Sequence, residues 1–164
     1  MPQITPFLWF DDQAEQAAQF YVSVFPNSRI AEVTHYSTAG PGPAGSVMTV
    51  RFILDGNEFL ALNGGPAHYG FDESISFMVN VATEDELDHY WSALTDGGQE
   101  IACGWLKDRY GLRWQIVPDG LSAVLSDPDP ERSQRAAQAM MGMKKLDLRV
   151  MREAADGQST QAAT

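Results

Sequence analysis

One succession of hydrophobic patterns occurs twice along the chain, and this repetition constrains the fold more than any other feature of the sequence. Each half contains a strand pattern, a helix pattern and three further strand patterns, with an Asp-Gly pair between two of the strands. Asp-Gly pairs tolerate the positive φ angles of tight hairpin turns. The sequence therefore predicts an α+β chain of two βαβββ modules, at about 3–66 and 71–128, that form one cup-shaped mixed sheet around a small-molecule pocket.

The first module is predicted to contain an amphipathic helix and a hairpin. Apolar residues between positions 14 and 25 recur at helical spacing on one face, and Pro26-Asn27 ends this helix. Residues 40–45 are only Gly, Pro and Ala, so we expect a mobile loop there. The predicted strands are 4–10, 29–36, 47–54 and 57–63.

The second module repeats this order with a clearer helix start. Thr83 and Glu86 form the pattern of a capping box, in which a hydroxyl and a carboxylate satisfy free backbone amides. Gly97-Gly98 favours the left-handed conformation that ends many helices. Residues 74–81 alternate apolar and polar side chains, as a half-buried strand does. The predicted strands are 74–81, 100–106, 112–117 and 121–125.

A further helix is predicted after the second module, from Pro130, which suits a first helical position, to Gly142. Residues 146–151 fit either an alternating strand or a short amphipathic helix that starts near Asp147, and both alternatives stay open. We assign 129–150 to a C-terminal extension of one domain, residues 3–150. The Gln, Ser, Thr and Ala residues of 156–164 have nothing to bury, so we expect a disordered tail.

Composition bounds the class of protein. A chain of 164 residues with 44% hydrophobic residues is long enough to bury one compact core. A formal net charge of -11 disfavours nucleic acid and anionic membrane surfaces as partners. Cys103 is the single cysteine, so no intrachain disulfide forms, and no run approaches the ~18 uncharged apolar residues of a membrane span. We expect a cytoplasmic protein.

Metal binding is not indicated by the residues. The three histidines are His35 near a strand end, His68 in a polar loop and His89 on the exposed side of a helix. None lies in a strand that also offers carboxylates at alternating positions, as an inward-facing ligand set would require. We expect no metal site.

Nucleophilic and cofactor chemistry are not indicated either. Cys103 follows Ala102 in a predicted strand without a nearby histidine, so we expect a buried inert thiol rather than a reactive one. The sequence contains no Gly-x-Ser-x-Gly turn, and Gly40-x-Gly42 lacks the strand-glycine-helix context of a dinucleotide or S-adenosylmethionine site. We therefore assign no catalytic residue and no cofactor.

An aromatic and polar cluster remains as the candidate ligand site. Apolar walls with a few placed hydrogen-bonding groups are typical of small-molecule pockets, although large aromatics also fill cores, and both interpretations stay open. Adjacent residues of a strand point to opposite faces, so one of the pair Trp114 and Gln115 faces the cup. The candidate ligand-binding residues are Asn63, Ser76, Trp105, Asp108, Trp114 and Gln115, with Tyr110 beside them.

Several stretches of the sequence resemble the PhnB-like branch of the glyoxalase/bleomycin-resistance (vicinal oxygen chelate) superfamily. The resemblance covers about residues 3–148. It rests on TPFLWF at 5–10, FPNS at 25–28, LNGG at 62–65, CGWLKDRYGL at 103–112, WQIVP at 114–118 and MKKLD at 143–147. It implies the duplicated βαβββ fold and a homodimer, as is usual in that superfamily.

The resemblance implies the fold of the superfamily but not its metal-dependent activities. Superfamily enzymes hold a divalent metal through His and Glu on the first, fourth, fifth and eighth strands. The matching stretches here, predicted as 4–10, 59–63, 74–81 and 121–125, contain no histidine and no carboxylate. Glyoxalase, dioxygenase and fosfomycin-type thiol-transferase activities are therefore not expected. The branch often bears the name 3-demethylubiquinone-9 3-methyltransferase, but no S-adenosylmethionine motif is found.

The sequence thus predicts a metal-independent protein that binds a small, partly aromatic or planar ligand. The alternatives are an enzyme, either a divergent metal-dependent lyase or dioxygenase or the methyltransferase of the family name, and a dimeric interaction module whose cup is filled by its own side chains.

Overall fold

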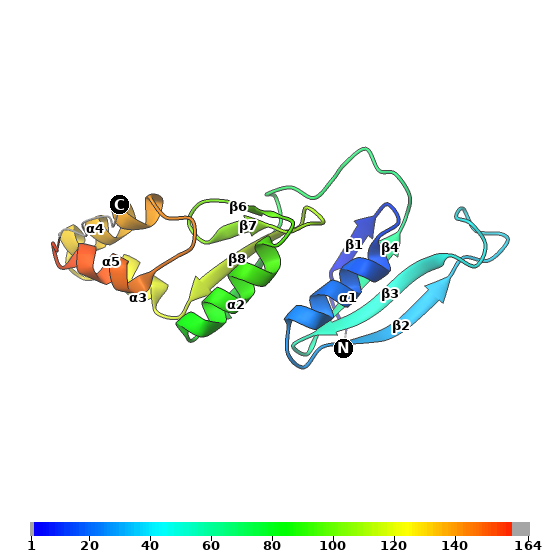
Figure 1. The fold of residues 1–164 in the computed structure, drawn as a ribbon, viewed down its shortest axis with the longest axis horizontal. Helices are drawn as coiled ribbons and strands as arrows, with labels where there is room; N and C mark the ends of the chain where they lie inside the picture. Colours follow the sequence, from blue (N-terminus) through cyan, green and yellow to red (C-terminus); the bar gives the residue numbers. More distant parts are fainter. Residues whose placement is uncertain (1, 159–164) are drawn as a thin grey trace. The chain divides into compact units, whose positions relative to one another are not determined.

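The structure, a computed structural model, describes residues 2–158. The chain divides after Gly70 into two compact units, and each is described here by itself (Figure 1). This boundary lies in the interval 66–71 between the two predicted modules. The union of the modules in one domain and one cup stays a prediction.

The first unit is a four-stranded mixed sheet with one helix. The strand order is β1-β4-β3-β2, in which β1 runs parallel to β4 and the other neighbours are antiparallel. Asp55 and Gly56 have φ angles of 44° and 80°, so the predicted Asp-Gly hairpin turn is confirmed. The elements are β1 (Phe7–Phe10), α1 (Ala14–Val24), β2 (Arg29–His35), β3 (Val47–Leu54) and β4 (Asn57–Asn63).

Helix α1 covers one face of this sheet, as Figure 1 shows. Its buried side chains recur at the predicted helical spacing and include Ala17, Ala18 and Tyr21. The Tyr21 ring stacks on Phe52 of β3, with centroids 6.2 Å apart, and Phe52 stacks on Phe59 of β4 at 5.5 Å. Such aromatic burial is the main source of stability of a small unit, at about 25 cal/mol per Å² of apolar surface.

The second unit repeats this topology. Its strand order is β5-β8-β7-β6, with β5 parallel to β8 and the other neighbours antiparallel, which is the same arrangement as in the first unit. The predicted duplication of a mixed α+β module is therefore confirmed. The elements are β5 (Phe77–Val81), α2 (Glu84–Thr95), β6 (Gln99–Glu100), β7 (Trp105–Lys107) and β8 (Arg113–Pro118).

The predicted signals at both ends of α2 are confirmed in large part. The Glu86 N–H donates to Thr83 Oγ1 at 3.2 Å, and the Glu86 carboxylate accepts from the Thr83 N–H at 3.3 Å, which is the capping box. Gly97 adopts the left-handed φ of 73°. Gly98 does not, but a Cβ there would lie 2.1 Å from the Lys107 carbonyl oxygen, so close packing requires this glycine.

Two strand predictions in the second unit are wrong. Residues 121–125 form helix α3 (Leu121–Leu125), because Gly120, with a φ of 93°, ends the β8 segment and Leu121 and Leu125 pack against the C-terminal helices. The eighth strand is therefore β8. Residues 100–106 do not form one strand either, since a turn with positive φ at Cys103 and Gly104 separates β6 from β7.

The C-terminal extension is helical. Helix α4 (Pro130–Met141) starts at Pro130 and is capped by Gly142, as predicted. Of the two alternatives at 146–151 the helix is right, because α5 (Leu148–Ala155) starts after Asp147, whose Oδ1 accepts from the Val150 N–H at 3.0 Å. Most of the predicted disordered tail, 159–164, lies outside the described residues.

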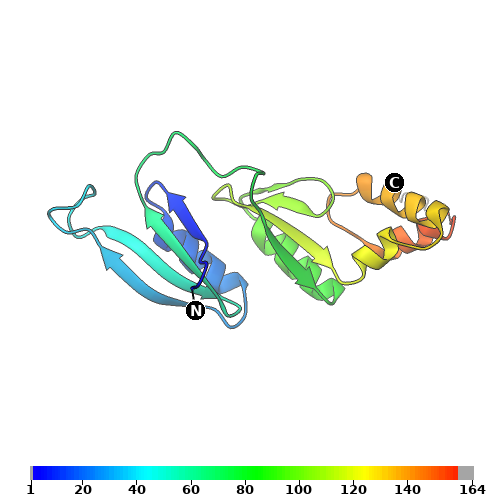
Figure 2. The same cartoon turned by 180° about the vertical axis from the view of Figure 1, so that it is seen from behind.

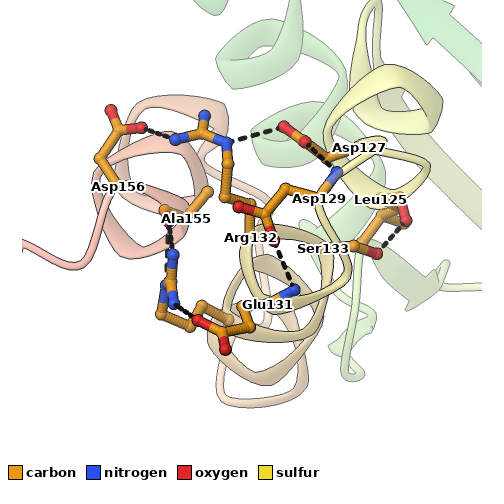
Figure 3. A network of polar contacts seen from close by, with 9 residues as sticks. Leu125, Asp127, Asp129, Glu131, Arg132, Ser133, Ala155 and Asp156 are labelled. Carbon is orange, nitrogen blue, oxygen red and sulfur yellow. Dashed lines mark hydrogen bonds and ion pairs between the residues drawn. The ribbon is translucent and has the colours of Figure 1, made fainter.

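The helices α4 and α5 are joined by an apolar core and a polar network. Ala136, Met151 and Ala155 are at most 2% exposed. Figure 3 shows Arg132 between Asp127 and Asp156, while Arg135 donates to the Ala155 carbonyl oxygen at 2.6 Å and 2.9 Å. Across residues 2–158, every helix is too short or too polar to span a membrane.

Candidate functional site

Each sheet carries its helix on one face only. Figure 1 shows α1 and α2 in front of their sheets, and Figure 2 shows the opposite faces, which these helices leave uncovered. In the second unit Leu106, Trp114 and Ile116 are buried on the helix side. The uncovered face of the second sheet is defined here by the alternate side chains Met78, Trp105, Lys107, Arg113 and Gln115, together with Ser76 before β5.

Three of the six predicted ligand residues lie together on this uncovered face. Gln115 pairs with Trp105 in the ladder of β7 and β8, and its Nε2 donates to Ser76 Oγ at 2.8 Å. All three side chains are half-buried. Among residues 2–158, the Trp105 indole N–H and the Gln115 amide oxygen have no hydrogen-bond partner. The face thus offers a π surface, a donor and an acceptor close together.

Asp108 and Trp114 lie on the other side of the sheet. Asp108 is 1% exposed and Trp114 is 3% exposed. The Trp114 Nε1–H donates to Asp108 Oδ2 at 2.8 Å, and Asp108 Oδ1 accepts from the backbone N–H groups of Tyr110 and Leu112 at 2.8 Å and 3.0 Å. The prediction that Trp114 and Gln115 face opposite ways is confirmed, and the cluster predicted as one group is divided by the sheet.

Asn63 lies in the first unit, at the end of β4. Its Oδ1 accepts from the Ala14 N–H at 2.7 Å, and its Nδ2 donates to the Val47 carbonyl oxygen at 3.1 Å. Its own carbonyl oxygen accepts from the Tyr36 hydroxyl at 2.6 Å. Asn63 therefore ties the start of α1 to β3 and to Tyr36.

Asn63 also lines a cavity of about 520 Å³ within the first unit. The other walls include Asp11 and Asp12 before α1, Glu15 in its first turn, the loop at 40–45 and residues 64–66 after β4. Gly42 of this loop packs on Tyr36, because a Cβ there would lie 2.5 Å from the ring. The sequence did not reveal this cavity, since its shape depends on how the loop folds back.

Two basic residues of the uncovered face were not among the predicted site residues. Lys107 and Arg113 are directly opposite each other on β7 and β8. Arg113 donates to Glu73 Oε1 at 2.7 Å and 2.9 Å, and this hydrogen bond lowers the pKa of Glu73. Lys107 lines a depression of about 480 Å³ beside the turn between β7 and β8. The alternation that placed Gln115 opposite to Trp114 also predicts the placement of Arg113, whereas Lys107 lies outside the predicted strands.

The residues present do not fit the metal site of the superfamily. Strands β1, β5 and β8 contain no His, Cys, Asp or Glu. Strand β4 contains Glu58, which lies in the predicted strand 57–63 but outside the stretch 59–63 that was matched to the superfamily strand. The Glu58 carboxylate accepts a long 3.4 Å hydrogen bond from Thr5. Within residues 2–158, no three side chains of these types are grouped so that they could hold an ion. A single carboxylate is not a ligand set.

The thiol of Cys103 is half-buried in the turn before β7, rather than buried in a strand as predicted. Its backbone N–H donates to the Met143 carbonyl oxygen at 2.8 Å, and the next N–H, of Gly104, donates to the Lys144 carbonyl oxygen at 2.7 Å. The extension therefore pairs with this turn, which explains why it is not a strand.

Known proteins match the part of the chain that contains all six predicted site residues. Residues 2–117 match the model of the family described as 3-demethylubiquinone-9 3-methyltransferase. A solved PhnB protein of Bacillus cereus that bears the same methyltransferase name is 33% identical, with a TM-score of 0.66, and the match covers 71% of this chain and 99% of that one. The extension after β8 lies beyond the family match.

Two more distant structures show the same fold. Protein PA1353 of Pseudomonas aeruginosa is 20% identical with a TM-score of 0.60, and the match covers 73% of this chain and 100% of that chain. The fosfomycin resistance protein FosX of Mesorhizobium loti is 11% identical with a TM-score of 0.50, with 71% and 90% covered. No protein with a curated description matches the chain.

Proposed function

This chain belongs to the 3-demethylubiquinone-9 3-methyltransferase family, the PhnB-like branch of the glyoxalase/bleomycin-resistance superfamily, and on that premise we propose that it is a metal-independent small-molecule-binding protein. The ligand is a planar, partly aromatic molecule that lies on the uncovered face of the second sheet. One observation carries the proposal: Trp105 lies opposite Gln115, and Gln115 is held by Ser76, on a face that α2 does not cover.

Each of these three side chains has a distinct role in the proposal. The Trp105 ring stacks on the ligand, and stacking of aromatic rings contributes about 0.5–1.5 kcal/mol beyond the area that it buries. The hydrogen bond from Gln115 to Ser76 fixes the amide, so that its oxygen points to a ligand donor without a large loss of side-chain entropy. The site therefore recognises shape first and one or two polar groups second.

The remaining predicted residues support the structure around the site and do not contact the ligand. Asp108 and Trp114 hold the turn between β7 and β8 and thereby the pairing of Trp105 with Gln115. Asn63 shapes the cavity of the first unit. We give these three residues a positioning role rather than direct contact with the ligand.

The proposal also covers the oligomeric state of the protein, its location and its independence of metal ions. We propose a homodimer, which sedimentation equilibrium of the purified protein tests directly. The single cysteine and the expected absence of disulfides favour a cytoplasmic location. Metal independence is supported by the lack of donor side chains on β1, β5 and β8, and added Ni²⁺, Zn²⁺ or Mn²⁺ should leave the melting temperature unchanged.

The family name favours a second candidate, methyl transfer to a quinone-like acceptor. This activity needs S-adenosylmethionine. Isothermal calorimetry with S-adenosylmethionine separates the two candidates, because the binding protein proposed here takes up none, whereas saturable one-to-one binding supports the methyltransferase.

The decisive experiment measures the binding of a neutral planar probe to the protein. Equilibrium dialysis with naphthalene-2-carboxamide should show saturable binding to the wild-type protein, and Trp105→Ala should weaken it at least about tenfold, since ~1.4 kcal/mol corresponds to tenfold in affinity. Tyr69→Ala is the matched control, because Tyr69 is an aromatic residue that is 88% exposed in a loop. Absence of saturable binding, or equal binding by Trp105→Ala, overturns the proposed function.

A further inference from the structure

The uncovered face of the second sheet holds two like charges in direct opposition. Lys107 on β7 and Arg113 on β8 are cross-strand partners on the same face. Like charges at opposed positions of a sheet destabilise it. An anion between or beside them removes that cost, so the chemistry of this face depends on which anions lie near it.

The protein supplies one such anion, the Glu73 carboxylate, and this carboxylate pairs with Arg113. Glu73 accepts from both Nε and Nη2 of Arg113, at 2.9 Å and 2.7 Å, and the same guanidinium donates through Nη1 to the Gly111 carbonyl oxygen at 2.5 Å. Within residues 2–158, the Lys107 ammonium has no carboxylate at ion-pair distance. Lys107 is nevertheless half-buried, as expected for a lysine whose apolar stem lies along the sheet while its ammonium reaches water.

The surroundings of Lys107 offer space for a ligand group. The depression of about 480 Å³ that Lys107 lines is otherwise formed by the glycines of the α2–β6 and β7–β8 turns and by Gln99, Asp108, Arg109 and Tyr110. Both oxygens of the Asp108 carboxylate are already hydrogen-bonded to donors on the covered side. Arg109 is paired with Asp96. The depression therefore presents a cation without a competing free carboxylate.

The position of Lys107 also suits a ligand that stacks on Trp105. The two residues are separated by one residue of β7 and point to the same face. Their Cα atoms are therefore about 6.6 Å apart, at ~3.3 Å per residue. An acidic group on an aromatic ring lies closer than this to the ring centre, and the flexible four-carbon stem of lysine can bring the ammonium to it, so ring and charge can be engaged at once.

We propose that the ligand of this face is a planar aromatic anion whose carboxylate, or a group of equivalent charge, pairs with Lys107. This inference rests on the proposed function and adds the charge of the ligand to it. Electrostatic complementarity favours such a ligand although the chain as a whole carries a formal net charge of -11, because the neighbouring Arg113 and Arg109 are paired with carboxylates and the Lys107 ammonium is left for the ligand.

The test compares two probes of nearly the same shape, naphthalene-2-carboxylate and naphthalene-2-carboxamide. At about 20 mM ionic strength the carboxylate should bind the wild-type protein about tenfold more tightly than the carboxamide, and this preference should shrink at about 500 mM, where charges are screened within a few ångströms. Lys107→Gln should abolish the preference, because it removes the charge that selects the carboxylate. Lys107→Arg should keep the preference.

Lys144→Gln is the matched control, because Lys144 is an exposed lysine that pairs with Glu100 on the other side of the sheet. It removes the same charge from the chain and should keep the preference. If both probes bind equally to the wild type through Trp105, the ligand is not selected by charge and this inference is overturned while the proposed function stands. If neither probe binds, the proposed function itself fails, and this inference with it.

Discussion

The indole N–H of Trp114 donates a 2.8 Å hydrogen bond to the carboxylate of Asp108, and both side chains are buried under α2. The second oxygen of Asp108 accepts two backbone N–H groups of the turn that joins β7 to β8. The carboxylate therefore holds the turn and the strand that follows it at the same time. This arrangement sets the pairing that places Trp105 opposite Gln115 on the uncovered face.

Replacement of Asp108 by Ala should destabilise the protein strongly. Three donors then lose their acceptor, two of them backbone amides, and the bonds from Leu112 and Trp114 are buried. We expect the free energy of unfolding to fall by about 3 kcal/mol, since an unsatisfied buried donor costs ~1–3 kcal/mol. Urea unfolding measures this change. Asp96→Ala, at an exposed carboxylate that pairs with Arg109, should cost well under half as much, and equal losses would contradict the role of Asp108.

The capping box of α2 predicts a smaller effect at Thr83. Thr83→Ala removes the acceptor of the Glu86 N–H and should lower the free energy of unfolding by about 1 kcal/mol, the usual cost of a lost N-cap. Ser92→Ala, at an exposed position within the same helix, should cost nothing, because Ala has the higher helix propensity. A loss at Ser92 as large as that at Thr83 would show that the box contributes little.

The network in Figure 3 predicts a loss of stability in acid. The pKa of Asp127 is lowered by the hydrogen bond from the Asp129 N–H, at 2.9 Å, and then by Arg132. Because the folded pKa lies below the unfolded one, the stabilisation is present above the unfolded pKa and is lost as the pH falls through the folded pKa. Asp127→Asn should therefore unfold more easily than wild type at pH 7, and the two proteins should converge in acid, as the pH falls through the lowered folded pKa of Asp127. A constant difference across this range would contradict the argument.

The predictability of the fold varies from element to element for physical reasons. The alternation at 74–81 and the capping box at Thr83 are local signals. The structure confirms the capping box and the strand over residues 77–81, while residues 74–76 lie before it. The short apolar run 121–125 fits a strand or a helix equally well, and only its contact with the C-terminal helices decides for the helix. The turn at Cys103 was likewise missed because its backbone pairs with residues 143 and 144, far along the chain.

The candidate site shows the same division. The opposition of Trp114 and Gln115 follows from strand periodicity alone. The location of Lys107 on the face of Trp105 does not, because the predicted strand 100–106 ended one residue before Lys107. The partners of Asp108 were beyond prediction, since three donors converge on it only once the turn has formed.

Asn63 offers a test of the first unit, because its side chain joins two elements that are distant in sequence. Asn63→Ala removes the acceptor of the Ala14 N–H and the donor to the Val47 carbonyl oxygen, and it should lower the free energy of unfolding by about 2 kcal/mol, at ~1 kcal/mol for each hydrogen bond. Asn63→Asp keeps the acceptor at the start of α1 but places a charge against the Val47 oxygen, so its loss should be intermediate. Asn57→Ala, which removes only long 3.3–3.4 Å bonds in the hairpin turn, is the control and should cost little. If Asn63→Ala unfolds at the same urea concentration as the control, Asn63 does not join these elements, and the cavity that it lines is held by Tyr36 and the loop at 40–45 instead.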